Sequence, residues 1–284
     1  MDKNYDIIFT GLAQNCENHI DRFFKIYEEV KKKYKAIAII SENNSTDFTF
    51  DKIIKKTFED KDIKFIDSTS IEKFDDRIHR LAHARQQQKE FIFQEKLKAK
   101  FIIVIDLDDV LSFNFDNLIF RKLINFLEKN RNKYFGLSVK SLPYYYDILN
   151  FESKDFPNTN VKKIQLDRKI DSYQRRKKKI YKVQKKISNL KDFECISAFN
   201  GMCIYNYEDY LLGNYFEDKN LIEEDTIPEH LNLNRKIHYL TKKYIYVSDE
   251  LNFKMPDEHR PLLNIFSFFF NKFLKYFSVY LKRR

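Results

Sequence analysis

The stretch Phe101-Ile102-Ile103-Val104-Ile105-Asp106-Leu107-Asp108-Asp109 decides the fold. Its run of five apolar, mostly β-branched residues is typical of a strand buried on both faces of a parallel sheet. Three carboxylates within four residues follow at the end of that strand. Carboxylates this close repel one another unless a cation or hydrogen-bond donors compensate, and their oxygens suit Mg²⁺ or Mn²⁺. The stretch therefore predicts a divalent-cation site at a strand end.

Alternating apolar and helical patterns extend this prediction toward the N-terminus. Earlier buried strands are expected at Tyr5–Leu12, Ala36–Ile40 and Ile63–Ile66. A long helix is expected over Arg77–Ala99, directly before the decisive strand. Such an order predicts an α/β fold with a parallel sheet and helices on both faces. Because ligands of these sheets bind at the carboxyl ends of the strands, the polar segments Gln14–Asn18, Glu42–Asp47 and Asp106–Asp109 should meet there.

The composition limits the functional classes. The 284 residues include only 4 Gly, and neither G-x-G-x-x-G nor G-x-x-x-x-G-K-[ST] occurs, which argues against Rossmann dinucleotide binding and P-loop NTPases. The 3 Cys form no C-x-x-C pair, and the start MDKNYDIIFTG is unlike a signal peptide, so a reducing, cytosolic setting is expected. A net charge of +10 favours an anionic partner: a nucleotide, a nucleic acid or a membrane surface.

The D-x-D element and the elements around it resemble nucleotide-sugar glycosyltransferases with the GT-A fold. In that family the D-x-D strand follows an N-terminal nucleotide-binding half, as Asp106-Leu107-Asp108 does here. Further segments match in the same order: a nucleotide-facing first strand (Ile7–Cys16), an E-x-x-S-x-D loop (Glu42–Asp47), an L-A-x-x-R helix (Leu81–Arg85) and an acceptor-side strand (Ser197–Tyr205). The stretch Glu223–His230 is similar to the C-E-H-I-P-x-H stretch of fungal capsule α-mannosyltransferase-like enzymes.

The resemblance implies roles for individual residues. It implies that Asp108, Asp106 and His230 hold Mn²⁺ or Mg²⁺, and that Asp225 or Glu224 is the general base that deprotonates the acceptor hydroxyl. A guanidinium pairs with phosphate through two parallel bonds, which is the role expected of Arg85. Contacts to the nucleotide sugar are implied for Thr10, Ala13, Asn15, Glu42, Asn44, Arg85, Asp106, Leu107, Asn200 and Gly201.

The chain is expected to form one GT-A-like α/β domain over residues 1–255, with a nucleotide-binding half (1–110) and a less regular acceptor half (111–255). Residues 256–284 are expected to form a basic amphipathic helix, in which Leu262–Leu281 carries a Phe-rich face. Such a helix suits the membrane interface, and docking on the core is the alternative.

The sequence thus predicts a metal-dependent glycosyltransferase that moves a sugar from a UDP- or GDP-linked donor to a glycan or lipid-linked acceptor. The resemblance implies surface polysaccharide (capsule or lipopolysaccharide) biosynthesis at the cytoplasmic face of the membrane. The first alternative is a haloacid-dehalogenase-type phosphatase with Asp106 as nucleophile, although its nucleophile strand usually comes first in the chain. The second is a nucleic-acid-binding protein that uses the basic run Arg175–Lys186, although no recognised nucleic-acid module is present.

Overall fold

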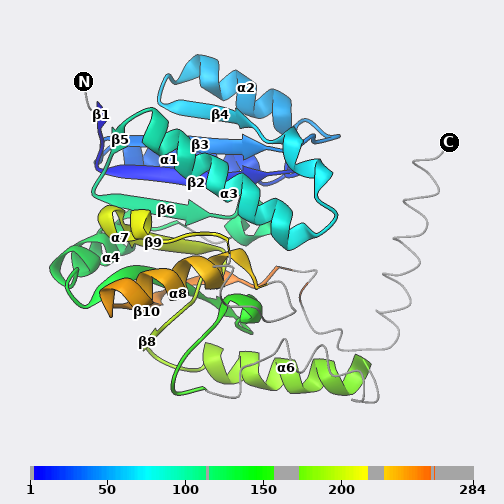
Figure 1. Ribbon diagram of the computed structural model, residues 1–284, viewed down its shortest axis with the longest axis vertical. Coiled ribbons are helices and arrows are strands. Elements are labelled where there is room, and N and C mark those ends of the chain that lie inside the picture. Colours follow the sequence, from blue (N-terminus) through cyan, green and yellow to red (C-terminus); the bar gives the residue numbers. More distant parts are fainter. Residues whose placement is uncertain (1–2, 113–114, 157–172, 217–226, 257–258, 260–284) are drawn as a thin grey trace.

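The structure is a computed structural model that describes residues 3–112, 115–156, 173–216, 227–256 and 259. Its helices lie on both sides of one central sheet (Figure 1). The strands are β1 (Lys3–Asn4), β2 (Ile7–Ala13), β3 (Ala36–Glu42), β4 (Ile63–Asp67), β5 (Leu97–Lys98), β6 (Phe101–Ile105), β7 (Tyr134–Leu142), β8 (Phe193–Cys195), β9 (Met202–Asn206) and β10 (Tyr244–Lys254). The helices are α1 (Ile20–Lys31), α2 (Thr49–Glu59), α3 (Arg77–Gln94), α4 (Asn117–Lys129), α6 (Tyr173–Ser188), α7 (Tyr207–Leu212) and α8 (Glu229–Thr241), with short 3₁₀ helices η1 (Thr69–Lys73), η2 (Asp109–Ser112) and η3 (Ile148–Asn150).

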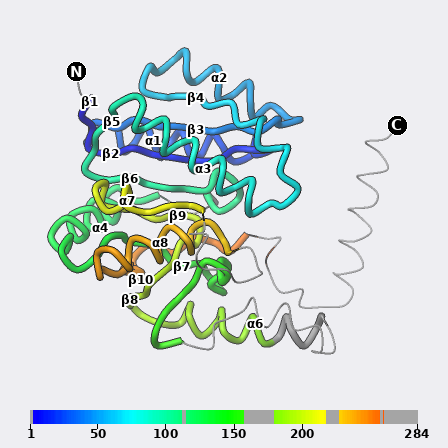
Figure 2. Tube along the Cα trace, viewed as in Figure 1, coloured from blue at the N-terminus to red at the C-terminus, as the bar shows by residue number. Residues whose placement is uncertain are grey.

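Within the described residues, eight strands form the central sheet in the order β4-β3-β2-β6-β9-β7-β10-β8. The first four of these are parallel to one another, which confirms the α/β class predicted from the sequence. Beyond β6 the sheet is mixed, because β9 runs antiparallel to both β6 and β7. β10 is then parallel to β7, and β8 is antiparallel to β10. Strands from both halves of the chain thus share one sheet, as the tube in Figure 2 shows.

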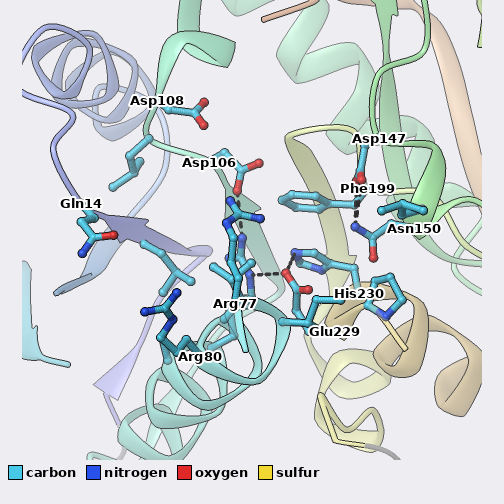
Figure 3. A pocket seen from close by; sticks show the side chains of 18 of the residues that line it. Gln14, Arg77, Arg80, Asp106, Asp108, Asp147, Asn150, Phe199, Glu229 and His230 are labelled. Atoms are coloured by element: carbon cyan, nitrogen blue, oxygen red, sulfur yellow. Dashed lines mark hydrogen bonds and ion pairs between the residues drawn. The ribbon is translucent and has the colours of Figure 1, made fainter. Parts of the chain in front are cut away.

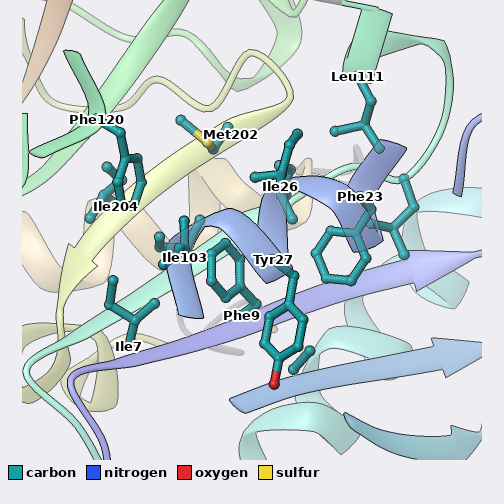
Figure 4. Close-up of a cluster of buried hydrophobic side chains, with 14 of the residues drawn as sticks. Ile7, Phe9, Phe23, Ile26, Tyr27, Ile103, Leu111, Phe120, Met202 and Ile204 are labelled. Atoms are coloured by element: carbon teal, nitrogen blue, oxygen red, sulfur yellow. The ribbon is translucent and has the colours of Figure 1, made fainter. Parts of the chain in front are cut away.

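β6 occupies the predicted residues and is buried along its whole length. Its side chains alternate between two hydrophobic clusters. Ile103 and Ile105 pack on the face that α1 and α4 cover, where Phe9, Phe23 and Tyr27 also lie (Figure 4). Ile102 and Val104 face the cluster to which α3, α7 and α8 contribute. Burial on both faces explains why the strand reads as a continuous apolar run.

The helix before β6 is shorter than predicted. α3 ends at Gln94 rather than Ala99. Lys96 then adopts a left-handed backbone with φ of 52°, which stops the helix, and Leu97–Lys98 pairs with β1 as a short parallel strand. The chain therefore crosses the amino-terminal edge of the sheet before it enters β6.

The strand register determines what gathers at the carboxyl-terminal edge. Ala13 at the end of β2 pairs with Glu42 at the end of β3, and Thr10 pairs with Val104 near the end of β6. Because β9 is antiparallel, its first residue, Met202, lies beside Ile105. The three polar segments predicted from the sequence and the turn before β9 therefore meet at one edge.

Candidate active site

A pocket of about 900 Å³ opens at this edge of the sheet. Each of the three polar segments contributes to its lining, through Gln14, Asn43 and the pair Asp106 and Asp108. Figure 3 shows Gln14 and Arg80 on one side, the two aspartates in the middle, and Asp147, Asn150, Glu229 and His230 on the other side. The meeting of the polar segments that the sequence predicted is confirmed.

Asp106 lies at the centre of the pocket and is held from three directions. Its backbone N–H donates to the carbonyl oxygen of Gly201 at 2.9 Å. Its Oδ1 accepts a hydrogen bond from Arg85 Nη2 at 2.9 Å, and its Oδ2 accepts one from the Tyr146 hydroxyl at 3.4 Å. The pKa of this carboxyl is raised to about 7, mainly because burial removes water from it and also because other carboxylates lie nearby. The Arg85 guanidinium lowers the pKa but does not cancel these effects.

Arg85 forms the floor beneath Asp106. Its side chain is 3 % exposed, its Nε lies 3.6 Å from Glu229 Oε1, and its guanidinium lies over the Phe199 ring at 5.2 Å. Among the described residues, Nε and Nη1 have no hydrogen-bond partner. The sequence predicted that Arg85 binds a phosphate with two parallel bonds. In the structure, Arg85 Nη2 donates a hydrogen bond to Asp106 instead, and this bond orients the Asp106 carboxylate.

Asp108 is exposed and extends into the pocket (Figure 3). Its Oδ1 accepts a hydrogen bond from the backbone N–H of Val110 at 3.1 Å, which orients the carboxylate. Leu107, between the two aspartates, also lines the pocket and packs against Gly11 of β2. A Cβ at Gly11 would lie 2.8 Å from Leu107 Cδ1, so glycine is required for this close approach.

The residues predicted to bind the nucleotide divide into two groups. Ala13 lines the pocket directly. Glu42, Asn15 and Asn44 instead hold the loops beside it, because Glu42 accepts from the Ser45 N–H at 2.6 Å, Asn15 Oδ1 accepts from the Thr46 N–H at 2.8 Å, and Asn44 Nδ2 donates to Glu72 at 3.1 Å. Thr10 is buried within β2, and its hydroxyl has no partner among the described residues. Neighbouring residues, including Gln14, Ser41 and Asn43, provide the lining at this end.

Asn200 and Gly201 form the turn before β9, both with left-handed backbone (φ of 54° and 88°). Asn200 donates its backbone N–H to Asp147 Oδ2 at 3.1 Å, while Gly201 provides the carbonyl that Asp106 bonds. A Cβ at Gly201 would overlap Val110. Neither residue is among those that line the pocket, and both support carboxylates that do.

Sequence reasoning missed two pocket carboxylates. Asp147 follows β7 and accepts hydrogen bonds from Asn150 Nδ2 at 2.9 Å (Oδ1) and 3.1 Å (Oδ2). Asn150 Oδ1 in turn accepts from the backbone N–H of Leu231, so this cluster links β7 to α8. Glu229 begins α8, and burial raises the pKa of both Asp147 and Glu229. Neither residue belongs to a spaced motif, and the only sequence signal was the segment Glu223–His230 around Glu229.

His230 is buried and stacks on Phe199 with ring centroids 3.6 Å apart. Burial lowers its pKa well below the usual value, so the imidazole is neutral at pH 7. Among the described residues, no group of three or more His, Cys, Asp or Glu side chains is arranged to hold a metal ion. The ligand roles of Asp106, Asp108 and His230 therefore stay predictions. Glu224 and Asp225 lie outside the described residues.

Neither protein-family models nor curated protein sequences match this chain. Solved structures do match its fold. The mannosyltransferase PcManGT from Pyrobaculum calidifontis, solved in complex with GDP-Man and Mn²⁺, superimposes with a TM-score of 0.52 and 10 % sequence identity. The chain has a GT-A glycosyltransferase fold. This confirms the fold predicted from the sequence.

The match to PcManGT covers 93 % of this chain and 60 % of that protein, so the chain spans less than two thirds of its length. Two further structures are similar at lower scores. Glucosyl-3-phosphoglycerate synthase from Mycobacterium tuberculosis, in complex with Mn²⁺, UDP and glucosyl-3-phosphoglycerate, has a TM-score of 0.49 and 11 % identity over 91 % of this chain and 74 % of that one. S. aureus TarS 1–349 has a TM-score of 0.48 and 12 % identity over 87 % and 59 %. At these identities the likeness concerns the GT-A fold.

Proposed function

We propose that this chain is a metal-dependent glycosyltransferase that moves a sugar from a nucleotide-sugar donor to a glycan or lipid-linked acceptor. The observation that carries the proposal is the pocket at the carboxyl-terminal edge of a GT-A sheet, with Asp106 and Asp108 at its centre. The similarity to PcManGT supports the fold on which this function depends.

The layout of the pocket matches an extended donor (Figure 3). Gln14, Ser41 and Asn43 lie at the ends of β2 and β3 and offer polar groups to a nucleoside. The two aspartates occupy the middle, where a diphosphate would lie. Asp147 and Glu229 are on the far side, where a sugar would reach them. The proposed donor thus runs across the edge of the sheet from β3 toward β7.

The carboxylates at the centre fit a divalent cation. Asp108 and Asp106 offer oxygen ligands, and the pKa of Asp106 is raised mainly by desolvation and further by the carboxylates around it, which a bound cation would offset. Mg²⁺-type sites commonly use one or two carboxylates plus substrate phosphates, so the lack of a three-residue cluster among the described residues agrees with such a site. A bound cation would stabilise the charge that develops on the departing nucleoside diphosphate. Arg85 would keep Asp106 oriented toward it.

The order of the strands weakens the phosphatase alternative, because the strand that carries Asp106 is the fourth to enter the central sheet rather than the first. The carboxylates that line the pocket weaken the nucleic-acid alternative, because they would repel nucleic-acid phosphates unless a cation were bound.

Asp108→Asn tests the proposal. We expect nucleotide release from a panel of UDP- and GDP-sugars in Mn²⁺ buffer to fall by about 10²-fold or more, because the change weakens charge stabilisation at the leaving group. Asp51→Asn on the exposed face of α2 is the matched control and should retain full activity. Full activity of Asp108→Asn, or of the wild-type chain in excess chelator, would contradict the proposal.

The acceptor and the location are further parts of the proposal. Surface polysaccharide biosynthesis at the cytoplasmic face of the membrane agrees with the basic character of α6 and of the C-terminal sequence. The helix expected from residues 262 to 281 lies outside the described residues, and no helix in the described part has the length and apolar character needed to cross a bilayer. Flotation with anionic liposomes should show binding of the full chain and loss of binding for residues 1–260. Equal binding would refute membrane attachment through this segment.

A further inference from the structure

One wall of the pocket is formed by Asp147, Asn150, Glu229 and His230, and we name it the β7–α8 wall. Asp147 and Asn150 belong to the segment after β7, and Glu229 and His230 to the first turn of α8. Figure 3 shows these four side chains together, across the pocket from Gln14 and Arg80. The bond from the Leu231 N–H to Asn150 Oδ1 at 3.2 Å joins the two segments, so the wall is a single unit.

The wall has hydrogen-bonding capacity that the protein does not use. His230 is 1 % exposed, and neither ring nitrogen has a hydrogen-bond partner among the described residues. A neutral imidazole carries one donor and one acceptor, and leaving both unpaired in a buried position is unfavourable. Within the described part of the chain, Asp147 accepts three hydrogen bonds, whereas a carboxylate has about four acceptor positions. Glu229 is 3.6 Å from Arg85 Nε, beyond hydrogen-bond distance. These groups together would satisfy a ligand rich in hydroxyls.

Two of the four wall residues, Asp147 and Glu229, are carboxylic acids. The pKa of Glu229 is raised by burial and by Asp147, although Arg85 and Arg77 oppose the shift. The pKa of Asp147 is raised by burial as well, although Arg85 and His259 oppose it. Desolvation thus outweighs the facing cations at both carboxyls, and the wall disfavours added negative charge.

We propose that the β7–α8 wall selects an uncharged, hydroxyl-bearing donor sugar and excludes sugars that carry a carboxylate. This inference rests on the proposed function. A sugar hydroxyl donates to Asp147 or Glu229 and also pairs with the neutral His230. A sugar carboxylate only accepts hydrogen bonds and would lie beside two protein carboxylates, which is a repulsive element of the kind that gives specificity.

Paired donors isolate this effect. UDP-glucose and UDP-glucuronic acid differ only in a CH₂OH group against a carboxylate, and GDP-mannose and GDP-mannuronic acid form a second such pair. We would measure binding of all four, and of UDP and GDP alone, to the full chain by calorimetry in Mn²⁺ buffer near pH 7. For the nucleotide that binds, the uncharged sugar should bind at least about tenfold more tightly than its acidic counterpart.

Variants assign the selection to the wall. Asp147→Asn and Glu229→Gln each remove one charge with little change in shape, and each should reduce the ratio several-fold while binding of the nucleoside diphosphate alone stays the same. Glu128→Gln, on exposed α4, should leave the ratio unchanged. Circular dichroism reports whether each variant folds, and Glu229→Gln provides the test if Asp147→Asn does not fold.

Each outcome bears on a different claim. Equal binding of the two members of a pair would overturn the selection of uncharged sugars. A ratio that stays the same in both folded variants would overturn its assignment to the β7–α8 wall. Absence of binding by all four nucleotide sugars and by both nucleoside diphosphates would contradict the proposed function itself, and the inference with it.

Discussion

Replacement of Arg85 by methionine tests how the floor of the pocket is stabilised. Methionine keeps much of the length and volume of the side chain, so the loss reports mainly the charge. Arg85 is buried between Asp106 at 2.9 Å and Glu229 at 3.6 Å, and its removal leaves the partly buried Asp106 and the buried Glu229 without their cation. Breaking a buried pair in this way costs about 3–5 kcal/mol. At about pH 9, where Asp106 is ionised beside the guanidinium, we therefore expect Arg85→Met to lower the free energy of unfolding by about 3 kcal/mol, the lower end of that range.

The loss should shrink on acidification, because the carboxyls that lost their partner take up protons. With Arg85 present the pKa of Asp106 is about 7, and without Arg85 it is higher still, so the variant's carboxyl takes up its proton as the pH falls toward 7 and the loss shrinks over that range. Urea unfolding followed by circular dichroism, in the presence of a chelator, measures the effect. A double-mutant cycle with Asp106→Asn should give a coupling energy of about 1–3 kcal/mol. Additive losses, or a loss below about 1 kcal/mol for Arg85→Met, would refute the account of an ion pair at the pocket floor.

Other changes probe the same edge of the sheet. Burial raises the pKa of Asp106 from 3.8 to about 7, so between these pH values the carboxyl holds a proton in the folded chain that it lacks in the unfolded chain, and stability should fall as the pH rises. In metal-free urea titrations, Asp106→Asn should remove up to about 1.4 kcal/mol per pH unit of this dependence. An unchanged pH dependence would contradict the raised pKa. Gly11→Ala should cost about 1–3 kcal/mol through overlap with Leu107, and a loss that Leu107→Ala fails to reduce would show that the contact is not responsible. Gly201→Ala should cost at least about 1–3 kcal/mol because φ is 88° and Val110 is in the way, and thermal unfolding equal to wild type would disprove this strain.

The sequence was most informative where a local pattern determined the structure. The run Phe101–Ile105 is a strand over the same residues because burial on both faces requires continuous apolar side chains. The helix expected to reach Ala99 ends at Gln94, since the left-handed backbone at Lys96 and the pairing with β1 override helical propensity there. Propensity alone contains no information about either event.

The site was predictable only in its N-terminal half. Asp106 and Asp108 were evident because they follow a buried strand. Asp147 was not, because a single carboxylate after β7 has no spacing signal, and only the mixed sheet order brings it to the pocket. The role of Arg85 was also hidden, since its two partners lie 21 and 144 positions away along the chain and meet it through tertiary packing.

The reversed direction of β9 has a consequence for how the site can change. The parallel strands β2 and β6 end at this edge, so they place there only the segments that follow them. The antiparallel strand β9 begins at this edge, because its first residue is beside the last residue of β6, so it places there the segment that precedes it. The turn through Asn200 and Gly201 therefore supports Asp106 and Asp147 from a segment that is independent of the nucleotide-side loops. Substitutions in that turn can alter the shape of the sugar side while the loops after β2 and β3 keep their bonds to one another. In the binding mode proposed above, the fold thus separates the residues that would bind the common part of a donor from those that would distinguish one donor from another.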